Sequence, residues 1–86
     1  MHGKRVVVFV APGTGMFAPV ASRRVGGAVQ RNRARRILRA AWREIAPRIG
    51  TANDIVLVAK PAIQGAKTQD LVAEMTELTE ELAWSR

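Results

Sequence analysis

Cysteine is absent from the 86-residue sequence, so neither disulfide bonds nor thiolate metal sites can reinforce the fold. This absence suits the cytosol, and we expect a cytoplasmic protein. The single histidine, His2, lies near a terminus that we expect to be mobile, which is typical of an incidental residue rather than a general base. The sequence therefore predicts no catalytic residue in the protein itself, and no cofactor or metal bound by it.

Long hydrophobic runs are absent too. Val6–Ala11 is too short for a membrane span or for the apolar core of a signal peptide, and Pro12-Gly13 ends it at once. A strand is the better interpretation, and we expect no membrane partner. We find no repeat and no linker, so residues 1–86 are expected to form one small domain with a modest buried core.

Acidic residues are scarce in the first part of the chain. Residues 1–48 carry eleven Lys and Arg against Glu44 alone, a net charge of +10, whereas residues 49–86 carry three cations against six acids, a net charge of −3. Eleven of the fourteen cations are Arg, whose planar guanidinium pairs bidentately with phosphate and stacks on bases. This one-sided field indicates a nucleic-acid partner rather than a plain solubilising surface.

Hydrophobic periodicity predicts a small two-layer α+β sandwich in the order strand, strand, helix, strand, helix. Pro19 lacks an N–H group and so places the second strand at a sheet edge, while the continuous apolar third strand is expected at the centre. The first strand is expected to be covered on both faces. The expected elements are strands at Arg5–Ala11, Phe17–Ser22 and Ile55–Ala59, a helix from about Ala28 to Ala46 ended by Pro47 and Gly50, and a last helix with Thr68 as its N-cap.

The first predicted helix has two opposite faces. Its apolar stripe repeats at the helical period and comprises Ala34, Ile37, Leu38, Ala41, Trp42 and Ile45. The opposite face presents Asn32, Arg36, Arg39 and Arg43, flanked by Arg33 and Arg35 and preceded by Arg23 and Arg24. Arg supplies phosphate contacts, and the Asn amide can bond to a sugar or a base. Because Glu44 is the only acid on this helix, the pattern predicts a nucleic-acid interface.

The last predicted helix is acidic on one side. Its expected buried stripe is Leu71, Met75, Leu78 and Leu82, and its expected solvent face is Asp70, Glu74, Glu77 and Glu81. This face would repel a polyanion and should point away from RNA. A solvated surface is the simpler interpretation, and docking against a basic protein surface is the functional alternative.

Residues 22–39, SRRVGGAVQRNRARRILR, resemble the signature of the bacterial ribonuclease P protein. In that family a Ser-basic-basic-Val-Gly turn leads into a helix that opens with Arg-Asn-Arg. Residues 54–61, DIVLVAKP, resemble the family's last strand, and Thr68 lies where its closing helix begins. The resemblance covers nearly the whole chain, and the Arg-Asn-Arg block with its flanks is highly specific.

The resemblance implies a left-handed crossover through the Arg-rich helix and a subunit that assists a catalytic RNA in removing the 5′ leader from precursor tRNA. Magnesium would be held by the RNA. The sheet face would form a cleft for the leader, in which Phe9 could stack on a base. The residues implied to contact the catalytic RNA are Ser22, Arg23, Arg24, Arg31, Asn32, Arg33, Arg35, Arg36 and Arg39, and the face pattern adds Arg43.

Members of that family usually carry a further helix and strand before the position of Lys4, and their absence here implies a sheet with less cover. Val6, Val8, Val10 and Phe9 cannot all be buried by two helices, because alternate residues of a strand face opposite sides. We therefore expect a homodimer that shields the sheet, and the alternative is a monomer whose sheet is covered by the catalytic RNA or by another protein. Two alternatives to the ribonuclease P interpretation are a free-standing RNA-binding or chaperone-like module and a DNA binder that inserts the Arg-rich helix into a major groove.

Overall fold

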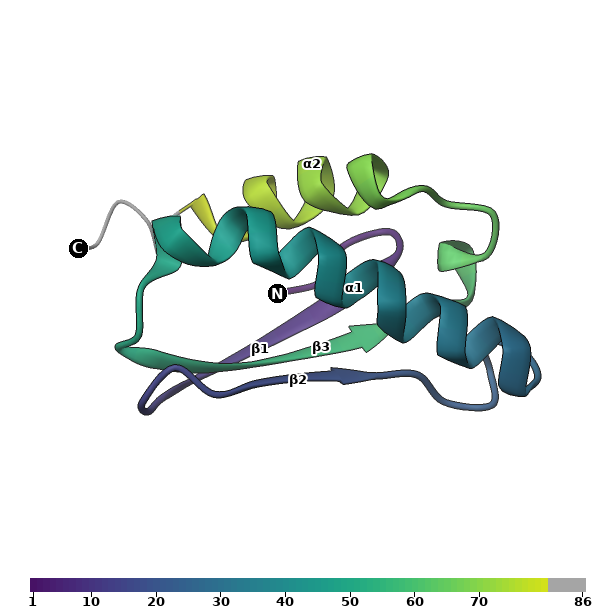
Figure 1. Cartoon of the computed structure of the whole chain (residues 1–86), viewed down its shortest axis with the longest axis horizontal. Helices are drawn as coiled ribbons and strands as arrows, with labels where there is room; N and C mark the ends of the chain where they lie inside the picture. The colour runs from purple at the N-terminus through teal and green to yellow at the C-terminus, as the bar shows by residue number, and fades with distance from the viewer. Residues whose placement is uncertain (81–86) are drawn as a thin grey trace.

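The computed structural model describes residues 1–80 and contains three strands and two helices in the predicted order (Figure 1). The strands are β1 (Val6–Pro12), β2 (Phe17–Val20) and β3 (Asn53–Ala59). The helices are α1 (Ala28–Ile49) and α2 (Thr68–Leu78), and a short 3-10 turn, η1 (Pro61–Ile63), precedes α2.

The last strand in the chain occupies the middle of the sheet. β3 pairs antiparallel with β1 and parallel with β2, so the spatial order is β1-β3-β2. The chain therefore leaves β2, passes through α1 and returns into the neighbouring parallel strand. Figure 1 shows α1 and α2 side by side over the same face of the sheet. The two-layer sandwich, the central third strand and the edge position of the second strand are all confirmed.

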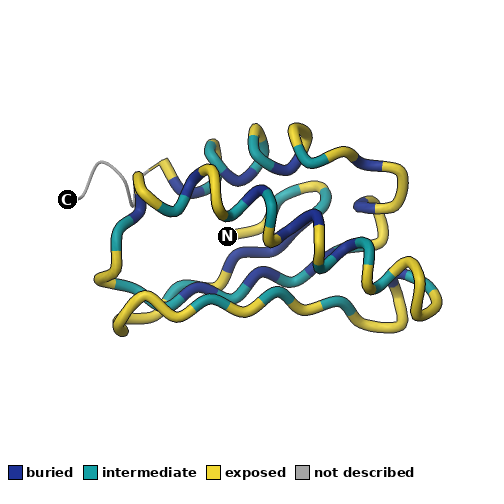
Figure 2. Tube along the Cα trace, viewed as in Figure 1, coloured by how far each residue is buried: buried dark blue, intermediate teal, exposed yellow. Residues whose placement is uncertain are grey.

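The core fills the space between the sheet and the two helices. Alternate strand residues point inward, so that Val8 of β1 lies opposite Leu57 of β3, and both are almost fully buried. Leu38 of α1 and Met75 of α2 are also completely buried. Figure 2 shows that buried positions occur in the strands and in both helices. Each such side chain contributes roughly 1.5–3 kcal/mol relative to an exposed position, so the helices are held mainly by this shared core.

The opposite face of the sheet is open. No helix within residues 1–80 covers it, and 54% of Phe9 and 42% of Val20 are exposed. Val56 and Val58 between them are half-buried. The expectation that the first strand is covered on both faces is therefore wrong for Phe9, because α1 and α2 lie on the other side of the sheet. Val7 is buried because the first residues of the chain pair with β1 at this position.

Each edge of the sheet is partly protected. The Met1 carbonyl accepts the Val8 N–H at 2.7 Å and the Met1 ammonium donates to the Val8 carbonyl at 2.8 Å, so the terminus beside His2 is paired rather than mobile as expected. At the other edge, the Ile55 N–H donates to the Met16 carbonyl, which fixes which residues of β2 bond to β3. In this register the backbone N and carbonyl of Pro19 point away from β3. Pro19 therefore costs no ladder bond and offers no donor to another strand.

Pro47 does not end α1, contrary to the expectation. The helix continues to Ile49, and Gly50, with a φ of 78°, caps it by donating its N–H to the Ala46 carbonyl. Pro47 lacks the N–H that would bond to the Arg43 carbonyl and its ring crowds that carbonyl. Burial of Ile49 in the core holds the extra turn in place. Trp42, expected in the buried stripe, is half-buried and stacks on Phe17 of β2, with ring centroids 5.1 Å apart and planes 4° from parallel.

Thr68 is the first residue of α2 rather than its N-cap. Lys67 occupies the cap position, and its backbone N–H donates to Asp70 Oδ2 at 2.9 Å. The Asp70 carboxylate stabilises the first turn of the helix, because it accepts a bond from a backbone N–H that has no partner within the helix. Leu71 and Met75 are buried as expected and Leu78 is half-buried, whereas Leu82 and Glu81 lie outside the described residues.

Candidate nucleic-acid interface

The exposed side of α1 carries a continuous ridge of polar and cationic side chains. Asn32, Arg36, Arg39 and Arg43 are all exposed, and they lie on the side of α1 opposite its buried residues. We call these four residues the α1 ridge. Glu44, the one acid of the helix, lies on the flank toward α2, where its carboxylate accepts a bond from Gln69 Nε2 at 3.4 Å. No carboxylate therefore interrupts the ridge, and its field is attractive to a phosphate backbone along its whole length.

Two of the flanking arginines are held by neighbours. Arg33 donates from Nη2 to the Ala66 carbonyl at 2.6 Å, which ties α1 to the segment before α2. Arg35 donates from Nη2 to Asn32 Oδ1, which orients the amide at the start of the ridge. Arg31 and Arg35 precede Trp42 by eleven and seven positions, so they share the flank that packs on β2. The predicted residues thus divide between the ridge and its two flanks.

The basic turn before α1 is fixed by one buried side chain. Val25 is fully buried and its carbonyl accepts a bond from Gln64 Nε2, while its N–H donates to the Ser22 carbonyl. Gly26 follows with a φ of 142°, a conformation that residues with a side chain rarely adopt. With Val25 anchored inward, Arg23 and Arg24 on its N-terminal side are left exposed.

A pocket joins this turn to the open face of the sheet. It has a volume of about 420 Å³, and its lining includes Ser22 and Arg24 of the turn together with Val58 of the sheet. Lys60 also lines it and donates from Nζ to the Gly3 carbonyl at 2.9 Å. Lys60 was not among the predicted site residues, although a cation directly after the central strand was a usable signal.

Phe9 is not brought together with the α1 ridge. It lies on the open face of the sheet, whereas the ridge points away from the sheet on the helical side. The predicted site residues therefore form two surfaces, with the turn at Ser22–Arg24 between them. A single strand of RNA could contact both only by passing that turn.

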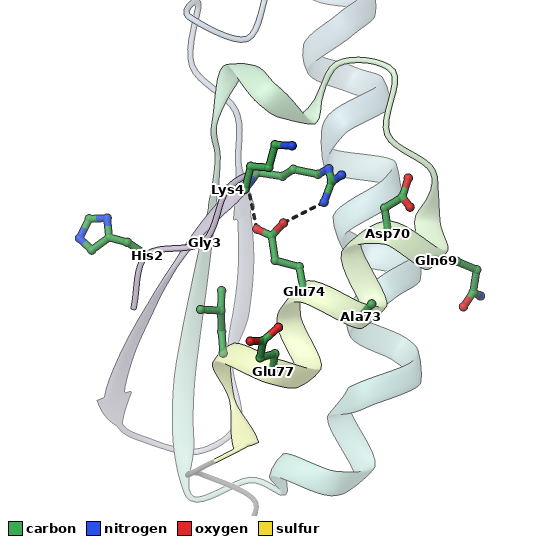
Figure 3. A pocket seen from close by; sticks show the side chains of 10 residues that line it. His2, Gly3, Lys4, Gln69, Asp70, Ala73, Glu74 and Glu77 are labelled. Atoms are coloured by element: carbon green, nitrogen blue, oxygen red, sulfur yellow. Dashed lines mark hydrogen bonds and ion pairs between the residues drawn. The ribbon is translucent and has the colours of Figure 1, made fainter.

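The acidic helix departs from the expected solvent face at Glu74. Figure 3 shows the Glu74 carboxylate reaching from α2 to the start of β1. It accepts the backbone N–H groups of Arg5 at 2.8 Å and Val6 at 3.1 Å, and it pairs with the Arg5 guanidinium at 3.1 Å. Only 12% of its side chain is exposed, so Glu74 joins the two layers. Asp70 and Glu77 remain exposed beside it, around a pocket of about 550 Å³.

Within residues 1–80 no group of three or more His, Asp or Glu side chains is arranged to hold a metal ion. No helix in the same part of the chain is long and apolar enough to cross a bilayer.

Comparison with known proteins places these features in a family. A family model described as Ribonuclease P matches residues 1–83. A ribonuclease P protein component from Nitratiruptor sp. is 38% identical over 82 residues, covering 94% of this chain and 74% of that protein. Another from Chloroflexus aurantiacus is 47% identical over 60 residues, covering 69% of this chain and 44% of that protein.

Solved structures share the fold. The RNase P protein from Thermotoga maritima, in complex with 1-(4-fluorophenyl)-2-thiourea, superposes with a TM-score of 0.77 at 19% identity, covering 91% of this chain and 79% of that one. The Staphylococcus aureus RNase P protein gives 0.75 at 20% identity, covering 93% and 76%. At 19–20% identity these superpositions show a shared fold.

Proposed function

The chain belongs to the ribonuclease P protein family, and on that premise we propose that it binds the catalytic RNA of ribonuclease P and assists removal of the 5′ leader from precursor tRNA. The observation that supports this most directly is the uninterrupted α1 ridge with the basic turn before it. Asn32, Arg36, Arg39 and Arg43 would contact the catalytic RNA, with Arg31, Arg33 and Arg35 on the flanks and Ser22, Arg23 and Arg24 in the turn. The site of action would be the cytoplasm.

Cleavage would belong to the RNA. Magnesium required for the reaction would be held by RNA phosphates, and the protein would raise the affinity of the complex for its substrate by neutralising phosphate charge. A free-standing RNA-binding module would have the same ridge, so the decisive test uses the cognate catalytic RNA. At low magnesium, adding the protein should increase cleavage of precursor tRNA, while the protein without RNA should release no leader. Equal cleavage with and without the protein would contradict the proposal.

The open face of the sheet would receive the single-stranded leader. Phe9 is exposed in the middle of the edge strand β1, Val56 lies next to it on the central strand, and the pocket beside Arg24 offers a cation for a leader phosphate. Stacking on an aromatic ring is worth about 1–3 kcal/mol per base. Phe9→Ala should therefore weaken binding of precursor tRNA to the holoenzyme by roughly 5- to 150-fold, with little change for mature tRNA. An equal loss for both RNAs would place Phe9 outside the leader site.

The same face supports a proposed homodimer in the absence of RNA. Its exposed Phe9 and Val20 would be shielded by a second copy, and the partly protected edges favour face-to-face stacking of sheets over pairing of edge strands. A dimer of this kind would dissociate when leader RNA occupies the face. Light scattering across a wide concentration range should show a dimer that precursor tRNA converts into a one-to-one complex. A cooperatively melting monomer at high concentration would refute the dimer.

A further inference from the structure

We infer that a cavity beside the N-terminal end of α1 binds one unstacked nucleobase of the RNA held on the α1 ridge. This inference rests on the proposed RNA-binding function. The cavity has a volume of about 360 Å³ and lies between the first turns of α1 and the segment that follows η1. It is separate from the pocket at the sheet face and from the acidic pocket at α2.

The floor of the cavity is apolar and rigid. Val25, Ala34 and Ile63 line it, and none of the three is more than 1% exposed. Val25 is held by the turn bonds described above, and Ile63 donates its backbone N–H to the Lys60 carbonyl within η1. Their burial holds the wall of the cavity in place, and mainly apolar walls are typical of pockets that bind small aromatic groups.

The rim of the cavity carries groups that match the edge of a base. Gln64 donates from Nε2 to the Val25 carbonyl, which fixes its amide and leaves Oε1 to accept. Gln30 is exposed and presents a second amide, with both a donor and an acceptor. Arg33 donates one N–H to the Ala66 carbonyl, and its guanidinium carries further N–H donors. Amide and guanidinium groups make the bidentate contacts by which proteins recognise bases.

Charge and position favour a base attached to a phosphate backbone over a free cation or an acidic peptide. None of the lining residues is acidic, whereas Asp70, Glu74 and Glu77 line the pocket at α2. Arg33 stands beside Asn32 in the chain and connects the cavity to the start of the ridge. A phosphodiester held there would place a neighbouring base within reach of the floor, and RNA-binding proteins commonly recognise such splayed-out bases.

The test uses the full chain and single-stranded RNA nonamers in which one abasic residue is moved through every position. With the intact protein we expect one interior position at which loss of the base lowers affinity on the order of tenfold. In the Gln30→Ala variant this penalty should fall below about threefold, because the amide that reads the base is missing. Val29→Ala is the matched control, since Val29 is the adjacent helical residue, is 78% exposed and does not line the cavity.

A second readout locates the base. The methyl resonances of Val25 and Ile63 should shift when the intact nonamer binds and should stay in place with the sensitive abasic nonamer. Shifts confined to the sheet face around Phe9 would overturn the inference, as would an abasic penalty that survives in Gln30→Ala. If all abasic nonamers bind like the intact RNA, the cavity inference is wrong and the ridge stands. If no nonamer binds with salt-dependent affinity, the proposed RNA interface itself is wrong.

Discussion

Replacing Arg36 and Arg39 with Ala tests the middle of the α1 ridge. Both side chains lie opposite the buried residues of α1, and neither bonds to any residue within positions 1–80. Ala is the strongest helix former, so the free energy of unfolding of the double variant should differ from that of the original protein by no more than about 0.5 kcal/mol. Affinity for RNA should fall, because two phosphate contacts are lost.

The size of the effect is best measured through its salt dependence. Each phosphate contact contributes about 0.7 to the log–log slope for single-stranded RNA, so losing two should flatten the slope by about 1.4. Between 50 and 200 mM salt the original protein should then lose roughly sevenfold more affinity than the variant. Fluorescence anisotropy with labelled RNA, titrated at four or more salt concentrations, gives both quantities.

The matched control removes the same charge elsewhere. Lys4 and Lys67 are exposed and lie off the ridge, and changing both to Ala also lowers the net charge from +7 to +5. This control measures the effect of net charge alone, without loss of direct contacts to RNA. Its salt-dependence slope should change by less than half as much as that of the Arg36/Arg39 variant. An equal change in the two double variants would mean that the ridge does not touch RNA, and unfolding of the Arg36/Arg39 variant would mean that the faces of α1 are wrongly assigned.

Three further predictions concern the helices. Glu74→Ala should lower the free energy of unfolding by about 2 kcal/mol in urea titrations, because two backbone N–H groups and the Arg5 guanidinium lose their charged acceptor. The control Glu77→Ala, at an exposed neighbouring site, should change the free energy of unfolding by less than about 0.5 kcal/mol. Trp42→Ala should cost roughly 2–4 kcal/mol through loss of the stack on Phe17, below the range for a fully buried tryptophan, and a change under 1 kcal/mol in the same titration would contradict the observed packing. Glu77→Lys should leave RNA affinity unchanged or slightly raised at low salt, with the gain fading as salt increases; a marked loss in anisotropy titrations would place α2 against RNA.

The element order and the two faces of α1 could be predicted because they depend on local periodicity. The apolar residues from Ala34 to Ile45 repeat at 3.6 positions, and that repeat alone separates the stripe from the ridge. The central position of β3 followed from the absence of polar residues between Ile55 and Ala59. The edge position of β2 followed from Pro19. These properties belong to short stretches of sequence and need no knowledge of distant partners.

The failures involve residues whose role is set by a distant partner. Glu74 fits the acidic face of α2 by spacing, yet its carboxylate is bound by Arg5, 69 positions earlier in the chain. Pro47 reads as a helix end, but burial of Ile49 holds one more turn. The cavity beside α1 combines Gln30 with Gln64, which no pattern within either segment connects. Such contacts become visible only when the layers are assembled.

The strand order β1-β3-β2 has a consequence for how the chain is made. β1 and β2 share no ladder of their own, so neither has a pairing partner in the sheet until β3, which ends at Ala59, has been synthesised. Contacts this far apart in sequence form slowly, and the N-terminal part of a nascent chain is exposed while it waits. The first 48 residues, which hold eleven of the fourteen cations, therefore emerge from the ribosome as an unfolded polycation before the strand that organises them. Folding of the basic half of the chain depends on the completion of the half that supplies the central strand.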